Sequence, residues 1–156
     1  MSADLFMPEA IRLAEEGMLR NEGGPFGCVI VKEGHIVGRG NNQVLLTHDP
    51  TAHAEVVAIR DATRRLGNYS LHGCDLYTSC EPCPMCLGAI YWARIDRIYY
   101  ACTREDAAEI EFDDQMIYNE FAASRDMRKI PMISLMREES KRIFEMWVQK
   151  EDRIQY

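Results

Sequence analysis

Apolar positions in the first part of the chain repeat first at helical spacing and then in short runs. Leu5, Ile11, Ala14 and Met18 recur at intervals typical of one face of a helix, which predicts a helix near residues 5–20. Glycines and a proline at 23–25 end this helix. The β-branched run 28–31, a Glu-Gly turn at 33–34 and Ile36-Val37 then predict a hairpin of two strands.

Helix-start chemistry at Asp49-Pro50-Thr51 and a stop at Gly67 predict a helix over about residues 52–66. The remaining predicted elements are strand 76–79, helix 84–93, strand 98–102, helix 115–123, strand 132–136 and helix 139–150. A strand, a crossover helix and a second strand form a βαβ unit, whose strands are parallel. We therefore expect a single α/β domain over residues 1–156, with three layers and a mixed sheet of about five strands.

Composition and charge narrow the class of protein. The 156 residues are 47% hydrophobic and 28% charged, which is typical of one compact folded domain. No apolar run approaches the roughly 20 residues of a membrane-spanning helix, so we expect no membrane association. The net charge of -7 disfavours a binder of long nucleic acid, which needs an excess of cations. The first residues do not resemble a secretory signal, and we expect a cytoplasmic protein acting on a small molecule.

His53, Cys83 and Cys86 are candidate zinc ligands. Each is expected in the first turn of a helix, where free N–H groups and the positive helix end stabilise thiolates. Cys83 and Cys86, three residues apart, face the same side. Two thiolates and one imidazole leave the fourth position of a tetrahedral zinc ion for water, as in catalytic sites. Anionic thiolates weaken the effect of zinc on the pKa of that water, so a nearby base is needed to deprotonate it. Glu55 is placed to be this base and to carry the water's proton to a leaving amine.

Other interpretations of these residues stay open. His53 and the two cysteines can be a buried histidine beside a redox dithiol, and Glu55 can be a solvated carboxylate at a helix start. Cys80 can close the metal site as a fourth ligand, as in structural Cys₃His zinc. Cys28, Cys74 and Cys102 are expected to be small buried hydrophobes.

The joint motif is more specific than any of its parts. Glutamate two residues after the histidine, with proline directly before the first cysteine ligand, is the signature of zinc nucleobase deaminases. Segments 50–56, 77–94 and 112–114, together with the chain length and the terminal Tyr156, resemble the bacterial guanine deaminases of the cytidine-deaminase-like superfamily. Ile110-Glu111 departs from that pattern, which has small residues before Phe112.

The resemblance implies a three-layer α/β/α cytidine-deaminase-like fold and the hydrolysis of guanine to xanthine and ammonia. It implies zinc held by the three ligands, and Glu55 as the proton shuttle. Asn42 would hydrogen-bond the purine, and Asp114 would contact the substrate and act as a second proton carrier. It further implies a homodimer whose C-terminal segments are exchanged. Tyr156 would then complete the partner's pocket, beside Phe26 and Trp92 in its wall.

Taken without the resemblance, these last residues have ordinary explanations. Asp113 and Asp114 can be a charged turn before a helix, Asn42 a turn residue, and Tyr156 a frayed chain end. The rival functions are a deaminase of another small ring, such as cytosine or an amino-triazine, a tRNA adenosine deaminase, and a structural zinc module that binds a protein partner. A basic groove would be needed for the tRNA enzyme, and a fourth protein ligand on the metal for the structural module.

Overall fold

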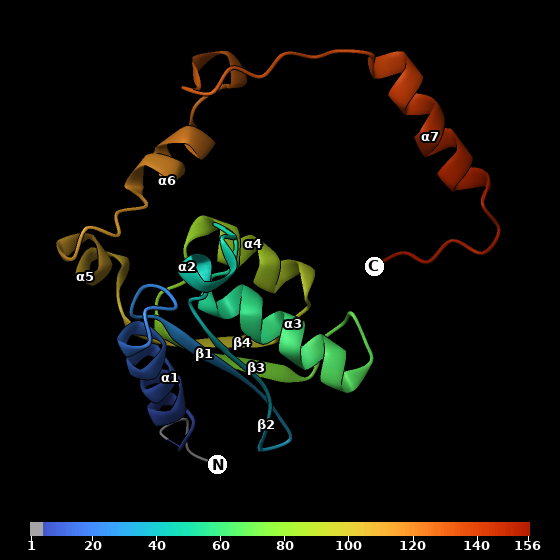
Figure 1. The fold of residues 1–156 in the computed structure, drawn as a ribbon. Coiled ribbons are helices and arrows are strands. Elements are labelled where there is room, and N and C mark those ends of the chain that lie inside the picture. Colours follow the sequence, from blue (N-terminus) through green and yellow to red (C-terminus); the bar gives the residue numbers. More distant parts are fainter. Residues whose placement is uncertain (1–4) are drawn as a thin grey trace. The chain divides into compact units, whose positions relative to one another are not determined.

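The computed structural model describes residues 5–156, and these divide into two compact units. The first unit ends at Asp114, and the second is Gln115–Tyr156. Figure 1 shows the elements of both units. In chain order they are α1 (Met7–Leu19), β1 (Gly27–Lys32), β2 (His35–Asn41), α2 (Val44–Thr47), α3 (Ala54–Leu66), β3 (Cys74–Cys80), α4 (Pro84–Trp92), β4 (Arg97–Cys102), α5 (Arg104–Glu109), α6 (Gln115–Ala122), the short 3₁₀ helix η2 (Arg125–Met127) and α7 (Arg137–Gln149).

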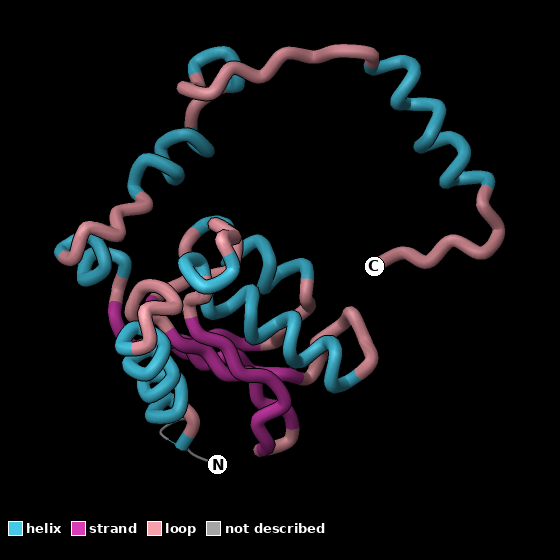
Figure 2. Tube along the Cα trace, viewed as in Figure 1, coloured by secondary structure: helices cyan, strands magenta, loops and turns pink. Residues whose placement is uncertain are grey.

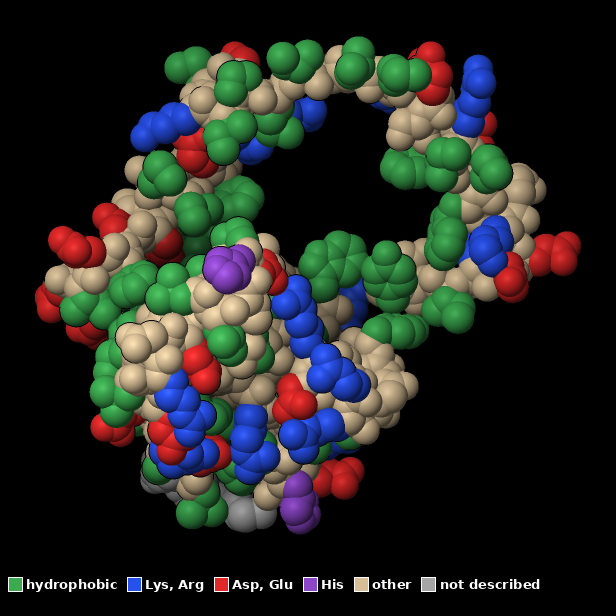
Figure 3. All heavy atoms as spheres, in the orientation of Figure 1, with side chains coloured by type: hydrophobic (Ala, Val, Ile, Leu, Met, Phe, Trp, Pro, Cys, Tyr) green, Lys and Arg blue, Asp and Glu red, His purple; other side chains and the backbone are tan. Residues whose placement is uncertain are grey.

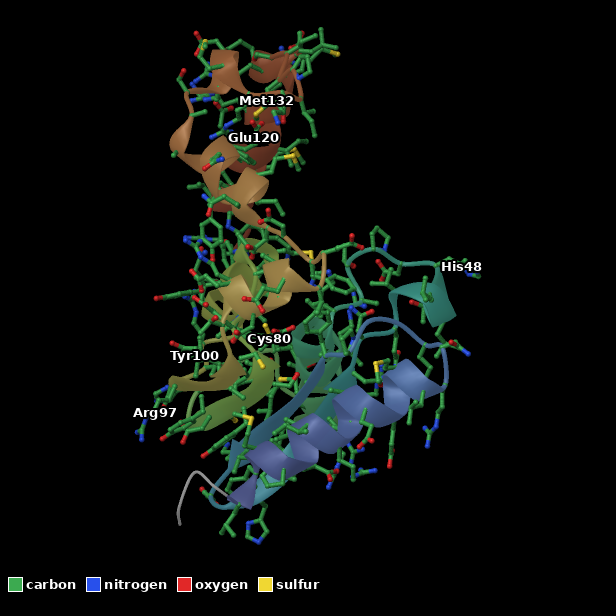
Figure 4. All side chains as sticks on the ribbon, turned by 90° about the vertical axis from the view of Figure 1, so that its left-hand side faces the viewer. His48, Cys80, Arg97, Tyr100, Glu120 and Met132 are labelled. Atoms are coloured by element: carbon green, nitrogen blue, oxygen red, sulfur yellow. The ribbon has the colours of Figure 1, made fainter. Side chains whose placement is uncertain are left out.

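The first unit is built on a mixed sheet with strand order β2-β1-β3-β4 (Figure 2). β1 runs antiparallel to both β2 and β3, whereas β3 and β4 are parallel and are joined through α4. The predicted hairpin and βαβ unit are therefore confirmed. Figure 4 shows Arg97 and Tyr100 on β4, which is one of the two outer strands of the sheet.

Side chains alternate across β1 and separate the core into two layers. Val29 and Val31 belong to a cluster packed by residues of α1, and Cys28 and Ile30 belong to one packed by α3 and α4. The period of two residues along a strand produces this division. The α/β/α arrangement expected from the sequence is confirmed, with α1 on one face and α3 and α4 on the other (Figure 1).

Glycine in β2 lets α3 approach the sheet unusually closely. A Cβ atom at Gly40 would lie 2.2 Å from the backbone oxygen of Ala54, in the first turn of α3. Any larger residue would push this turn away from the sheet. Because His53 and Glu55 flank Ala54, the contact at Gly40 also fixes their depth in the fold.

One predicted strand is absent, and the sheet has four strands rather than about five. Residues 132–136 form no strand in the part of the chain that the structure describes. Strand geometry needs a neighbouring strand to accept and donate its backbone hydrogen bonds, and residues 132–136 pair with no strand among residues 5–156. The short helices α2 and α5, which the apolar pattern does not predict, occupy loops before α3 and after β4.

The second unit consists of α6, η2 and α7, and none of its residues is buried. Its last helix is close to the predicted one, and hydrophobic side chains gather along it (Figure 3). The exposed apolar residues of α7 are Ile143, Phe144, Met146, Trp147 and Val148. Over residues 5–156, no helix has both the length and the apolar composition needed to cross a membrane.

Candidate active site

Two helices begin at the predicted metal site. His53 is the N-cap residue of α3 and Cys83 is the N-cap residue of α4, and neither side chain hydrogen-bonds the backbone of its helix. Pro84 at the first position of α4 is preorganised for a helix start and needs no N–H partner. Cys86 follows one turn later. The N-cap side chains are thus free for another use, and two positive helix ends lie near them.

The three side chains have the spacing of ligands on one metal ion. Cys83 Sγ and Cys86 Sγ each lie 3.5 Å from His53 Nδ1, and the three atoms lie within 4.8 Å of one another. A tetrahedral zinc ion, with bonds of about 2.3 Å to sulfur and about 2.0 Å to nitrogen, separates such ligands by about 3.5 Å. The donor set and its geometry therefore fit zinc.

Cys80 does not join this cluster. It ends β3, and its Sγ lies 3.5 Å from the backbone oxygen of Thr103 (Figure 4). Burial raises the pKa of the Cys80 thiol to about 12, which disfavours the thiolate form that zinc requires. The structure thus gives no support to a closed Cys₃His site. Cys28 and Cys74 are buried as expected, whereas Cys102 is exposed, contrary to expectation.

The two cysteine thiols shift each other's pKa in opposite directions. A hydrogen bond from Cys86 lowers the pKa of the Cys83 thiol to about 4, with further help from His53 and against the effect of burial. The same hydrogen bond and burial raise the pKa of Cys86 far above its usual range. The hydrogen bond with Cys83 also raises the pKa of His53. These shifts make Cys83 the more acidic thiol of the pair.

Glu55 lies inside the protein beside this cluster. It is in the first turn of α3, and only 6% of its surface is exposed. Burial raises the pKa of its carboxyl group, because the charged form loses hydration. The hydroxyl of Thr78, on β3, donates to Glu55 Oε1 at 3.2 Å. A solvated carboxylate at a helix start does not describe this residue.

Asn42 is fixed directly after β2. It is buried, and its Oδ1 accepts a hydrogen bond from the backbone N–H of Val44 at 3.1 Å. A Cβ atom at Gly23 would lie 2.1 Å from the same oxygen, so glycine is required there. No residue in the described chain accepts a hydrogen bond from Asn42 Nδ2. The amide N–H₂ group is thus available as a donor.

Asp114 and Phe26 are linked through Phe112. The rings of Phe26 and Phe112 meet edge to face, with their centroids 5.0 Å apart. Glu111, before them, has a positive φ of 72°, a backbone conformation that glycine adopts at less cost. Partial burial raises the pKa of Asp114, and the negative charge of Cys83 raises it further. Asp114 therefore lies within electrostatic reach of the metal cluster.

The structure does not bring Trp92 to the cluster. Trp92 ends the nine-residue helix α4, whose other end begins at the metal ligands. At a rise of about 1.5 Å per residue, the two ends are roughly 13 Å apart. The Trp92 ring instead lies under the guanidinium of Arg94, at 5.9 Å. Tyr156, the other predicted pocket residue, belongs to the second unit.

Thr78 is the residue that the sequence interpretation missed. It is almost fully buried, at 1% exposure, and is one of the few polar residues in the core. Its position two residues after Leu76 places it on the sheet face that α3 and α4 cover. A polar residue in phase with buried apolar residues is the signal that the sequence offers.

Comparisons with known proteins agree with this geometry. The family model described as "Cytidine and deoxycytidylate deaminase zinc-binding region" matches residues 1–102. Guanine deaminase of Bacillus subtilis (strain 168) is 51% identical over 147 residues, which cover 94% of each chain. A tRNA-specific adenosine deaminase of Aquifex aeolicus is 42% identical over 65% of this chain and 66% of its own.

Solved structures give the same result. The X-ray structure of guanine deaminase from Bacillus subtilis superposes with a TM-score of 0.96 at 49% identity and covers 100% of this chain and 99% of its own. The guanine deaminase of Nitrosomonas europaea gives a TM-score of 0.69 at 28% identity, over 72% of this chain and 65% of its own. Similarity at full length is thus to a guanine deaminase, and the tRNA enzyme is similar over a shorter part.

Proposed function

From the premise that the chain belongs to the cytidine and deoxycytidylate deaminase family, we propose that it is a zinc-dependent aminohydrolase acting on guanine. Guanine and water give xanthine and ammonia: a C–O bond forms and the C–NH₂ bond of the ring breaks. The observation that carries the proposal is the cluster of His53, Cys83 and Cys86 with a buried carboxylate beside it. When bound by these three residues, zinc supplies a Lewis acid that activates water.

We assign proton transfer to Glu55. Its carboxylate takes a proton from the attacking water and delivers one to the amine nitrogen that departs. A raised pKa suits this role, because a carboxylate whose pKa is raised binds a proton more readily and can then return it. Burial also keeps bulk water away from the proton that is being transferred.

We assign recognition of the ring to Asn42, Asp114 and Phe26. The free amide donor of Asn42 suits a purine acceptor, and the Asp114 carboxylate suits the N–H donors of guanine. An unmatched buried polar group costs about 1–3 kcal/mol, which would disfavour adenine at the same contacts. The ring of Phe26 offers an apolar surface beside Phe112, two residues before Asp114.

A panel of substrates tests the assignment of the ring. Guanine, cytosine, adenine, an amino-triazine and a tRNA anticodon stem-loop with a wobble adenosine would be compared at equal concentration. We expect ammonia release from guanine to exceed that from every other compound, because only guanine matches both the donor and the acceptor. Zinc-loaded enzyme that leaves guanine unchanged and deaminates another ring would overturn the proposed substrate. The net charge of -7 already disfavours the tRNA.

We further propose that residues 1–156 act as one deaminase domain in a homodimer with exchanged C-terminal segments. The second unit has no buried residue of its own, yet α7 carries a row of large apolar side chains. Exposed apolar faces of this kind are typical of surfaces that another chain covers. Exchange of an identical element is a simple way for two copies to cover them. In this arrangement Tyr156 completes the partner's pocket.

Deletion of Tyr156 is expected to reduce kcat/KM for guanine much more than it reduces the melting temperature. The physical reason is that the residue closes a pocket but contributes to no core within its own unit. Guanine turnover and thermal unfolding would be measured on the same preparation. Equal losses of activity and stability would contradict a role in the pocket.

Mixing two inactive variants tests whether Tyr156 acts on the other subunit. One variant lacks Tyr156, and the other carries Glu55→Gln with Tyr156 intact. Unfolding and refolding them together at equal amounts gives mixed dimers with one complete site, and about a quarter of wild-type activity should return. Each variant refolded alone is the control. No recovery in the mixture would exclude exchange of this residue.

A further inference from the structure

Thr78 has a polar side chain at a buried position whose neighbours are apolar. It lies on β3 in phase with Leu76, opposite Cys28 of β1, and both of these neighbours are fully buried. A buried hydroxyl is costly unless it is hydrogen-bonded. Valine has nearly the same shape and a higher preference for such a site. The hydroxyl therefore calls for an explanation beyond packing.

The hydroxyl has two acceptors within reach. Thr78 Oγ1 lies 3.2 Å from Glu55 Oε1 and 3.0 Å from the backbone oxygen of Cys80. A hydroxyl has one hydrogen and two lone pairs, so it can donate to only one of these oxygens at a time. The two contacts keep the Thr78 hydroxyl between the Glu55 carboxyl group and the end of β3.

Its position also restrains Glu55 from the side of the sheet. Glu55 comes from the first turn of α3. Thr78 contacts its carboxyl group from β3, which is held on both sides by β1 and β4. A carboxyl group held by its own helix and by a central strand has little freedom to rotate, and this geometry suits a group that must face two reaction partners in turn.

We propose that Thr78 is a positioning residue for the proton shuttle, because its hydroxyl holds the Glu55 carboxyl group in one orientation from β3. The inference rests on the proposed function, since it requires Glu55 to be the shuttle. The Cys80 carbonyl is the second oxygen within reach, and it helps to hold the Thr78 hydroxyl in place beside Glu55. In this proposal Thr78 acts through Glu55.

Two substitutions at Thr78 separate the hydroxyl from the packing. Thr78→Val keeps the shape and removes the hydroxyl, and we expect kcat for guanine to fall about 10- to 100-fold with KM changed less than about twofold. Thr78→Ser keeps the hydroxyl and loses a methyl group, and we expect its kcat to stay within about threefold of wild type. Zinc content and thermal unfolding are measured for both variants. Thr63→Val is the matched control, because its hydroxyl contacts only backbone oxygens within α3.

A double substitution tests whether Thr78 acts through Glu55. In a Glu55→Gln background, adding Thr78→Val should change the residual single-turnover rate by less than about twofold, because the group being positioned is gone. Zinc-loaded T78V with wild-type kcat overturns the proposal, as does T78S impaired as strongly as T78V, or a full additional loss in the double variant. If T78V does not fold, T78A is measured with the same expectations.

The same experiments distinguish this inference from the proposed function. A fully active Glu55→Gln enzyme would remove the shuttle, and this inference with it. An inactive Glu55→Gln enzyme alongside an unimpaired T78V enzyme would refute the role of Thr78 alone.

Discussion

Glu55→Gln is expected to lower kcat for guanine by about three to four orders of magnitude while zinc stays bound. Acid and base catalysis by one side chain contributes about 10²- to 10⁴-fold, and Glu55 serves both proton transfers. Glutamine has almost the same size and can still accept a hydrogen bond from Thr78, so the structural change is small. Only the capacity to take up and release a proton is lost.

Steady-state ammonia release and zinc content per chain would be measured on the same sample. Glu15→Gln is the matched control, since Glu15 is an exposed glutamate on α1 and the same chemical change there should leave kcat unaltered. An E55Q enzyme that retains zinc and full activity would show that another group moves the protons. If E55Q lost zinc, its low activity would reflect the missing metal rather than the missing proton shuttle. The kcat of Glu55→Asp would then be compared with that of wild type at full zinc loading.

Removal of the metal by a chelator is expected to abolish guanine turnover, and one equivalent of zinc should restore it. His53, Cys83 and Cys86 are spaced for one tetrahedral ion, and the proposed reaction needs the Lewis acid that such an ion supplies. Activity would be measured before chelation, after chelation and after readdition. Substantial turnover by metal-free protein would contradict a metal-dependent reaction.

Metal removal should also expose a reactive thiolate. The Cys83 pKa is lowered from its ordinary value of 9.0 to about 4, so the thiolate is present above about pH 4 and is lost as the pH falls below it. Metal-free protein should therefore be alkylated at Cys83 at pH 6, whereas zinc should protect the zinc-loaded protein. Cys102→Ser removes the exposed background thiol. Equal alkylation of Cys83 with and without zinc would contradict its role as a ligand.

The metal cluster was predictable because its spacing carries the chemistry. A histidine and a Cys-x-x-Cys pair at helix starts indicate ligands on one ion, and the structure confirms both helix starts. The burial of Glu55 was not predictable from its place in a first turn, where carboxylates are often solvated. It follows from the close approach of α3 to β2 at Gly40, a contact between segments distant in sequence.

The strand expected at 132–136 shows the limit of local patterns. An apolar run of the right length is compatible with a strand, but pairing depends on a free neighbouring edge at the right place. Trp92 belongs to the same motif as Cys83 and Cys86 but ends α4, whereas the ligands lie at its start, so its predicted place in the pocket wall stays a prediction.

The sequence by itself determined the ligand types, the order of helices and strands, and the family to which the chain belongs, because these depend on spacing along the chain. Only the tertiary structure decided that Glu55 is desolvated, that Asn42 keeps a free donor, and that Thr78 meets the carboxylate from β3. These properties arise where separate elements pack together, and burial and hydrogen-bond partners there depend on three-dimensional neighbours rather than on adjacent residues.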